Sequence, residues 1–154
     1  MPQKNTVLNT GNGSFSYTSD YIGFNIPDRV LRILDNKSIK DFNKYDEVMR
    51  EIRNRIHKLD KNSNKIGIPY YLIGVSNTEK NEPYRALKHE IAHAMYYLNK
   101  QYKNEIDELL NTIPNKKREL MKKQLKRHGY SISVFDDETQ AYLATGIIYR
   151  YETD

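Results

Sequence analysis

The chain contains no cysteine and no tryptophan, and it has only 7 glycines and 5 prolines among its 154 residues. Without cysteine, neither a disulfide framework nor a thiolate zinc site can form. Any metal ion must therefore be held by histidine and carboxylate side chains. No stretch approaches the roughly 18 consecutive apolar residues of a membrane span, so the sequence predicts a protein without a transmembrane segment.

Apolar residues are also scarce at the amino terminus, where residues 1–10 lack the apolar run of about 7–15 residues that marks a secretory signal peptide. We therefore expect a cytoplasmic protein, and a secreted one only if a leader was removed before Met1. The length is typical of one domain. We expect a single domain over 1–154, in which 1–27 is a poorly structured or edge-strand segment.

Positive charge exceeds negative charge, with 25 Lys and Arg against 20 Asp and Glu, for a net charge of +5. The excess is concentrated in segment 115–128. Such a cluster could contact nucleic-acid phosphates, an anionic membrane or an acidic protein, although most basic clusters are the solvated face of a helix. Its basic residues are Lys116, Lys117, Arg118, Lys122, Lys123, Lys126 and Arg127.

Hydrophobic periodicity predicts an α+β fold that is mostly helical. The best strand candidate is 66–75, in which Pro69 indicates an edge position or an early strand boundary, and 132–135 is a short extended piece. We expect this small edge-strand sheet to pack beside the helix 84–102. The helices that the pattern predicts cover 29–34, 38–59, 84–102, 104–113, 115–128 and 136–151.

The predicted helix 84–102 carries the sequence His89-Glu90-Ile91-Ala92-His93. The i, i+4 spacing places both imidazoles on one helical face, where they can bind one metal ion. Glu90 lies roughly 100° round the helix from His89, so it can flank the metal and accept a proton from a bound water. This H-E-x-x-H pattern is typical of zinc hydrolases.

An apolar stripe runs along the same predicted helix, on roughly the opposite side from the histidines. We expect this stripe to pack into the core while the histidines face another surface. Two ordinary surface histidines are the alternative interpretation of the motif. The stripe consists of Leu87, Ile91, Ala94 and Leu98.

Catalytic zinc commonly takes three protein ligands, so a third must come from elsewhere in the chain. His128 would give a three-histidine site. Glu138 would give two histidines and one carboxylate, and we favour it because Ala141 on the same helical face allows a close approach to the metal helix. Asp136 and Asp137 then serve as helix caps or accept an imidazole N–H.

The combination of His89-Glu90-x-x-His93 with Glu138-x-x-Ala141 on a later helix resembles the gluzincin group of metallopeptidases. The one-domain scale and the preceding strand are similar to the anthrax lethal factor catalytic domain and the Pro-Pro endopeptidases. The resemblance covers roughly residues 70–150. It implies a zinc endopeptidase that cleaves a peptide or protein substrate. Regulatory zincins of the ImmA/IrrE kind carry the same motif and a later glutamate, so the subfamily is open.

The same resemblance implies that a tyrosine supports the tetrahedral intermediate, from a position seven residues before the ligand glutamate. Ser131 has that position here, and Tyr130 lies one residue earlier. We expect Tyr130, or with less support Tyr142, to donate a hydrogen bond to the oxyanion. Glu90 would act as general base and then as general acid.

A different function class also fits the sequence. In this alternative the protein binds nucleic acid through the basic segment 115–128, and the metal is only structural. Its affinity for DNA or RNA would then fall steeply with salt. The intact Glu90 between the two histidines argues against a third class, an inactive relative that retains only the fold.

Overall fold

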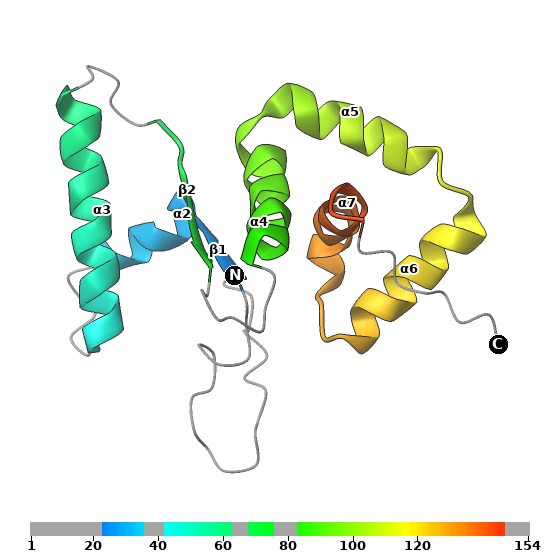
Figure 1. The fold of residues 1–154 in the computed structure, drawn as a ribbon, viewed down its shortest axis with the longest axis horizontal. Coiled ribbons are helices and arrows are strands. Elements are labelled where there is room, and N and C mark those ends of the chain that lie inside the picture. The colour runs from blue at the N-terminus through cyan, green and yellow to red at the C-terminus, as the bar shows by residue number, and fades with distance from the viewer. Residues whose placement is uncertain (1–22, 36–41, 63–67, 76–82, 147–154) are drawn as a thin grey trace, which may run out of the picture. The chain divides into compact units, whose positions relative to one another are not determined.

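The structure is a computed structural model that describes residues 23–35, 42–62, 68–75 and 83–146 (Figure 1). These residues form six α-helices, two short 3-10 helices and one two-stranded antiparallel sheet. The predicted mostly helical α+β class is confirmed. The chain divides into two compact units, one of Ile26–Leu72 and the other of Met1–Asn25 with Ile73–Asp154. A single domain over 1–154 stays a prediction.

The sheet pairs β1 (Gly23–Pro27) with β2 (Tyr71–Val75). Gly74 is required in β2, because a Cβ atom there would lie only 2.2 Å from the ring of Phe24. The strand predicted over 66–75 ends where β2 ends, at Val75, but β2 begins only at Tyr71, after Pro69. Residues 66 and 67 lie outside the described part, as do residues 1–22 of the predicted edge-strand segment.

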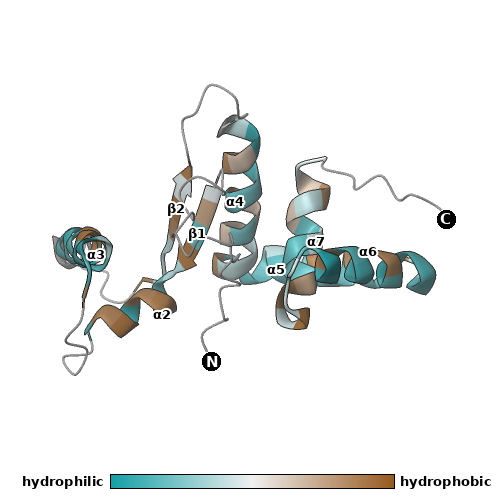
Figure 2. Cartoon of the chain, turned by 90° about the horizontal axis from the view of Figure 1, so that it is seen from below, coloured by the Kyte–Doolittle hydropathy of each residue, from teal (hydrophilic) through white to brown (hydrophobic). Residues whose placement is uncertain are grey.

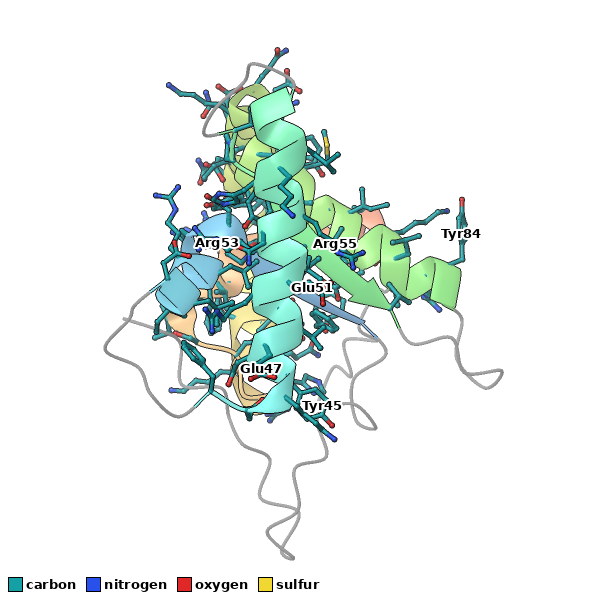
Figure 3. The ribbon with its side chains drawn as sticks, turned by 90° about the vertical axis from the view of Figure 1, so that its left-hand side faces the viewer. Tyr45, Glu47, Glu51, Arg53, Arg55 and Tyr84 are labelled. Atoms are coloured by element: carbon teal, nitrogen blue, oxygen red, sulfur yellow. The ribbon has the colours of Figure 1, made fainter. Side chains whose placement is uncertain are left out.

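The unit Ile26–Leu72 contains α2 (Asp28–Leu31), a 3-10 helix (Arg32–Asp35) and α3 (Lys44–Asn62). Arg53 of α3 is buried and forms an ion pair with Asp35, and this hydrogen bond lowers the pKa of the aspartate. Figure 3 labels Arg53 on α3 together with Glu51 and Arg55, whose side chains form an ion pair of 2.5 Å. The helix predicted over 38–59 begins later, at Lys44.

The described residues of the other unit form four α-helices: α4 (Pro83–Leu98), α5 (Lys100–Asn111), α6 (Asn115–Arg127) and α7 (Phe135–Ala144). The helix predicted over 84–102 is confirmed as α4, but it ends at Leu98 because the chain turns at Asn99, and the helix predicted over 104–113 begins already at Lys100. The Asn99 side chain accepts a hydrogen bond of 3.0 Å from the backbone N–H of Tyr102 and so caps α5. None of the helices in the described residues is long and apolar enough to span a membrane.

The segment before α7 is a 3-10 helix (Ile132–Val134), and the predicted extended piece over 132–135 is wrong. The Ser131 hydroxyl accepts from the backbone N–H of Ser133 and starts this turn. The α7 helix then begins at Phe135, so Asp136 and Asp137 lie in its first turn and do not cap it. Acidic residues in this position are stabilised by the positive end of the helix dipole.

The core of this unit lies where α4, α5 and α6 each contact α7. The predicted burial of the apolar stripe of α4 is wrong, since Leu87, Ile91 and Leu98 are 37–44% exposed. The buried face of α4 instead carries Glu90, Ala92 and His93, so that the polar motif faces inward. Figure 2 shows the mixed hydropathy of α4 along its length. Among the residues of this unit that the structure describes, the buried apolar side chains are those of Ala92, Leu110, Leu125, Phe135 and Ala141.

Ala141 is fully buried at 0% exposure, so enlarging it is expected to push α7 away from its neighbours. We predict that Ala141→Val lowers the free energy of unfolding by about 1–3 kcal/mol, the usual cost of overpacking. The control is Ala144→Val, because Ala144 is exposed on the same helix and should lose only about 0.5 kcal/mol in helix propensity. Urea denaturation followed by circular dichroism measures both, and equal losses would contradict the prediction.

Candidate metal centre

His89 and His93 lie one helical turn apart on α4 and point toward the same position. Their Nε2 atoms are 3.2 Å apart, and their rings are nearly perpendicular, at 85°. His93 is almost completely buried, and the His89 side chain is 13% exposed. The helix therefore presents two imidazole nitrogens to one point inside the unit.

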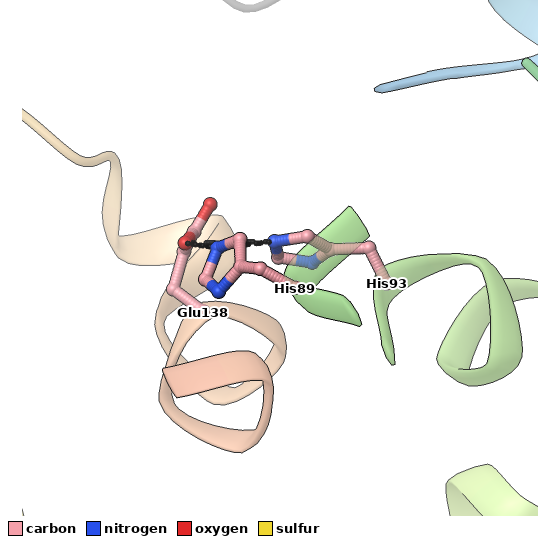
Figure 4. A group of neighbouring side chains, drawn as sticks. All are labelled: His89, His93 and Glu138. Atoms are coloured by element: carbon pink, nitrogen blue, oxygen red, sulfur yellow. Dashed lines mark hydrogen bonds and ion pairs between the residues drawn. The ribbon is translucent and has the colours of Figure 1, made fainter. Parts of the chain in front are cut away.

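Glu138 of α7 completes the group, as Figure 4 shows. Its Oε2 atom lies 3.7 Å from His89 Nε2 and 3.6 Å from His93 Nε2. Three ligand atoms held about 2.0–2.1 Å from one tetrahedral zinc ion lie about 3.3–3.4 Å from one another. The observed triangle is close to this size, so the three side chains could hold a metal ion.

The Glu138 Oε2 atom is buried and has no hydrogen-bond partner. Leaving a buried polar group unsatisfied costs about 1–3 kcal/mol of desolvation, and more when the group is charged. A bound cation removes this cost, because it supplies the missing opposite charge. The donor chemistry also fits a borderline metal ion, with two neutral nitrogens and one carboxylate oxygen.

Asp137 fixes the orientation of His93. Its Oδ1 atom accepts a hydrogen bond of 2.8 Å from His93 Nδ1, which leaves the Nε2 lone pair directed at the candidate metal position. The same oxygen accepts from Gln140 Nε2 at 3.1 Å, and Tyr102 of α5 donates to Gln140 Oε1 at 3.1 Å. A chain of hydrogen bonds thus runs from α5 through α7 to the imidazole.

The surroundings of His93 are negatively charged. Burial lowers the pKa of His93, but the hydrogen bond to Asp137 and the charges of Asp137, Glu138 and Glu90 outweigh this effect and raise the pKa overall. Burial and the charge of Asp137 also raise the pKa of Tyr102. The site therefore favours a positive charge, whether a proton or a metal cation.

Glu90 is 7% exposed and contacts the N-terminal part of β1. Its Oε2 atom accepts a hydrogen bond from the side-chain amide of Asn25. Its Oε1 atom lies 3.0 Å from the position that a Cβ atom of Gly23 would occupy, so a larger residue there would press on the carboxylate. The strand thus holds the Glu90 side chain in one place beside the two histidines.

The two candidate tyrosines lie together. The hydroxyls of Tyr130 and Tyr142 are hydrogen-bonded at 2.9 Å, and the ring of Tyr142 packs against that of His89, with 4.6 Å between centroids. Tyr142 thus contacts a candidate ligand directly, whereas the sequence favoured Tyr130. His128, the alternative third ligand, is the exposed C-terminal cap of α6 and does not belong to the group.

Sequence reasoning missed three residues that support the group. Gln140 could have been found, because it lies three residues after Asp137 on one helix and such pairs are neighbours. Tyr102 was assigned to the wrong helix, since the break at Asn99 was not predicted. Asn25 lies 65 residues before Glu90, and no local pattern connects the two.

Metal analysis of purified variants tests the third ligand. We predict one metal ion per wild-type chain, loss of that ion in Glu138→Ala, and its retention in His128→Ala. The reason is that Glu138 supplies the only carboxylate oxygen of the group, whereas His128 lies outside it. Inductively coupled plasma mass spectrometry after removal of loosely bound metal measures the ratio. Retention in Glu138→Ala together with loss in His128→Ala would reverse the assignment.

The hydrogen bond from His93 to Asp137 predicts that metal affinity also depends on a residue that does not bind the metal itself. Loss of such a hydrogen-bond partner commonly weakens metal binding by about 10–100-fold. We therefore predict that Asp137→Asn weakens the metal affinity by a similar factor. The adjacent Asp136 provides a matched control, because its carboxylate pairs with Arg118 at 3.2 Å and Asp136→Asn should leave the affinity unchanged. Competition with a chromophoric chelator measures both constants. Equal weakening by the two variants would show a general charge effect instead.

No protein-family model, no curated protein and no solved structure matches this chain. The interpretation of the site therefore depends on its own geometry and chemistry. These give a largely buried group of two histidines and one glutamate that could hold a metal ion. Two further carboxylates act on His93: Asp137 through a hydrogen bond and Glu90 through its charge.

Proposed function

We propose that this protein is a zinc-dependent endopeptidase. The observation that carries the proposal is the triangle of His89 Nε2, His93 Nε2 and Glu138 Oε2, with sides of 3.2–3.7 Å. Two histidines and one glutamate form a ligand set used by catalytic zinc. Three protein ligands leave one coordination position for water or substrate, whereas structural zinc sites are closed by four.

Zinc in such a site supplies Lewis-acid activation of a water molecule and of the scissile carbonyl. The protein supplies the proton transfers. Glu90 follows His89 directly on α4 and is close enough to His93 for its charge to raise the pKa of that imidazole. In the proposed mechanism its carboxylate accepts the proton of the attacking water and then passes it to the leaving amine.

The Asn25 amide helps to hold the Glu90 carboxylate in a fixed position for this role. A buried carboxylate needs hydrogen-bond donors to replace its lost hydration, and Asn25 provides one to Oε2. The other carboxylate oxygen, Oε1, lies beside Gly23 of β1. The carboxylate is thus restrained to a narrow range of positions, which favours proton transfer over a short, fixed distance.

Tyr130 or Tyr142 is the proposed donor to the oxyanion that forms during the reaction. Their hydroxyls are linked at 2.9 Å, and the ring of Tyr142 lies against a candidate ligand. In a linked pair one hydroxyl donates to the other, and the accepting hydroxyl keeps its own O–H for the oxyanion and becomes a stronger donor. The peptide bond as substrate follows from the resemblance of the motif to metallopeptidases, and cleavage specificity depends on parts of the site that the motif does not define.

Glu90→Gln tests the proposal. Glutamine keeps the shape and can still accept a hydrogen bond from Asn25, but it cannot take a proton. We predict that zinc remains bound while kcat/KM for peptide hydrolysis falls by at least about 10²–10⁴-fold, the usual contribution of a general base. A library of quenched fluorescent peptides supplies the substrates, and zinc content is measured on the same samples.

The control for this variant is Glu108→Gln, an exposed glutamate of α5 outside the group. It should keep both zinc and full activity. Stoichiometric zinc in the wild type without cleavage of any peptide would contradict the endopeptidase assignment. Unchanged hydrolysis in Glu90→Gln would contradict the role of Glu90.

A further inference from the structure

The α6 helix contains the whole positive excess of the chain. It has seven basic residues and one acidic residue, Glu119, which gives a charge of 7 − 1 = +6. The complete chain has a net charge of +5, so all the remaining residues together sum to 5 − 6 = −1. No comparable positive excess is present in α7, whose three charged side chains are all acidic, or in α5, which has two lysines and three acidic residues.

Most of these charges lie on the outer face of α6. Leu125 is 2% exposed on the opposite side of the helix, the side that faces the interior of the unit. Two basic residues form ion pairs, Arg118 with Asp136 and Lys122 with Glu119. Figure 2 shows α6 as a largely hydrophilic helix. The five other basic side chains are all exposed: Lys116, Lys117, Lys123, Lys126 and Arg127.

Helix stability explains only part of this charge arrangement, because the dipole favours Lys126 and Arg127 in the last turn but no other basic residue of α6. Lys116 and Lys117 lie in the first turn, where no acidic residue accompanies them and the helix dipole disfavours a cation by about 0.3–1 kcal/mol each. Lys123 and Arg127 are four residues apart, and like charges at that spacing repel one another by about 0.2–0.5 kcal/mol. Alternating signs are typical of a solvated helix laced with ion pairs, and α6 departs from that pattern with seven basic residues and one acidic residue.

We propose that the outer face of α6 binds the phosphate backbone of a nucleic acid. Lys116, Lys123 and Arg127 follow one another at helical spacing on a single line, which is about 16 Å long at 1.5 Å per residue. Duplex DNA carries one negative charge per about 1.7 Å of its axis, so several phosphates lie within reach of this line. The phosphate backbone has the charge density that this face complements.

The contact would be independent of nucleotide sequence. Lysine heads on this face are point charges suited to phosphate, and reading of bases commonly requires bidentate Arg, Asn or Gln side chains inserted into a groove. The exposed face offers one arginine, Arg127, at the end of the helix. The binding is therefore expected to be electrostatic, fast and strongly dependent on salt.

An anionic membrane fits this face less well. Helices that bind membrane surfaces insert an apolar face between the lipids, but the most buried apolar side chain of α6, Leu125, faces the interior of the unit. Leu120 is the one strongly apolar side chain of α6 that is exposed, at 41%. One leucine flanked by lysines is too small an apolar surface for insertion, so phosphate binding without insertion is the favoured interaction.

Fluorescence anisotropy with a labelled random-sequence duplex of about 20 base pairs, titrated between about 50 and 200 mM salt, tests the proposal. With five contributing cations, the slope of log K against log salt should be about −4 to −5 for the wild type. The triple variant Lys116→Gln, Lys123→Gln and Arg127→Gln should bind more weakly at every salt concentration, and its slope should be smaller in magnitude by about 3.

The control removes three exposed lysines from other helices, as Lys58→Gln, Lys88→Gln and Lys100→Gln. It should keep most of the affinity and the slope. Both triple variants should bind metal like the wild type, and the α6 variant should unfold at the same or a higher temperature, because its repulsions are reduced. These readouts do not depend on peptidase activity, so failure of the proposed function leaves this test intact.

Three results would overturn the nucleic-acid proposal. The first is no binding of duplex at the lowest salt concentration, and the second is equal weakening by the α6 and control variants. The third is preferential binding of another polyanion: vesicles of phosphatidylserine and phosphatidylcholine, or polyglutamate, binding more tightly than the duplex at equal ionic strength. Either preference would assign the face to a membrane or to an acidic protein instead.

Discussion

The contact between α4 and α7 is the constraint on which the rest of the site depends. It brings a pair of imidazoles from one helix against a carboxylate from another, 45 residues later (138 − 93). The hydrogen bond between His93 and Asp137 forms at the same contact, because Asp137 and Glu138 both lie in the first turn of α7. A small residue, Ala141, lies fully buried in this helix. A shift of α7 by one residue would turn Glu138 away from the histidines, because successive residues lie roughly 100° apart.

This contact also explains why α4 buries a polar face. Glu90 and His93 are more buried than the apolar side chains of Leu87 and Ile91 on the same helix. Their burial is tolerable because each has a partner: Asn25 for Glu90 and Asp137 for His93. Glu138 Oε2, by contrast, faces the two imidazole nitrogens without a hydrogen bond. A metal cation at this point would supply the opposite charge that this oxygen lacks.

Local patterns in the sequence predicted much of this arrangement. Helical periodicity, with Pro114 before the helix and Gly129 after it, predicted the bounds of α6 to within one residue. The spacing of His89 and His93 predicted that both side chains lie on the same face of α4. Three features could not be predicted. The helix boundary lies at Asn99, earlier than the predicted one between 102 and 104, because of one side-chain cap, and the contact of Asn25 with Glu90 depends on the path of β1. The exposure of Ile91 depends on which face of α4 meets α7, and amphipathicity alone pointed to the other face.

The account depends most on the presence and ligands of one metal ion. X-ray absorption spectroscopy at the zinc edge of the purified protein, loaded with one equivalent of zinc, tests this claim most directly. The account predicts two imidazole nitrogens and one carboxylate oxygen in the first coordination shell at about 2.0–2.2 Å, together with a water oxygen. A shell with three or more imidazoles, or one made only of water and buffer oxygens, would contradict it.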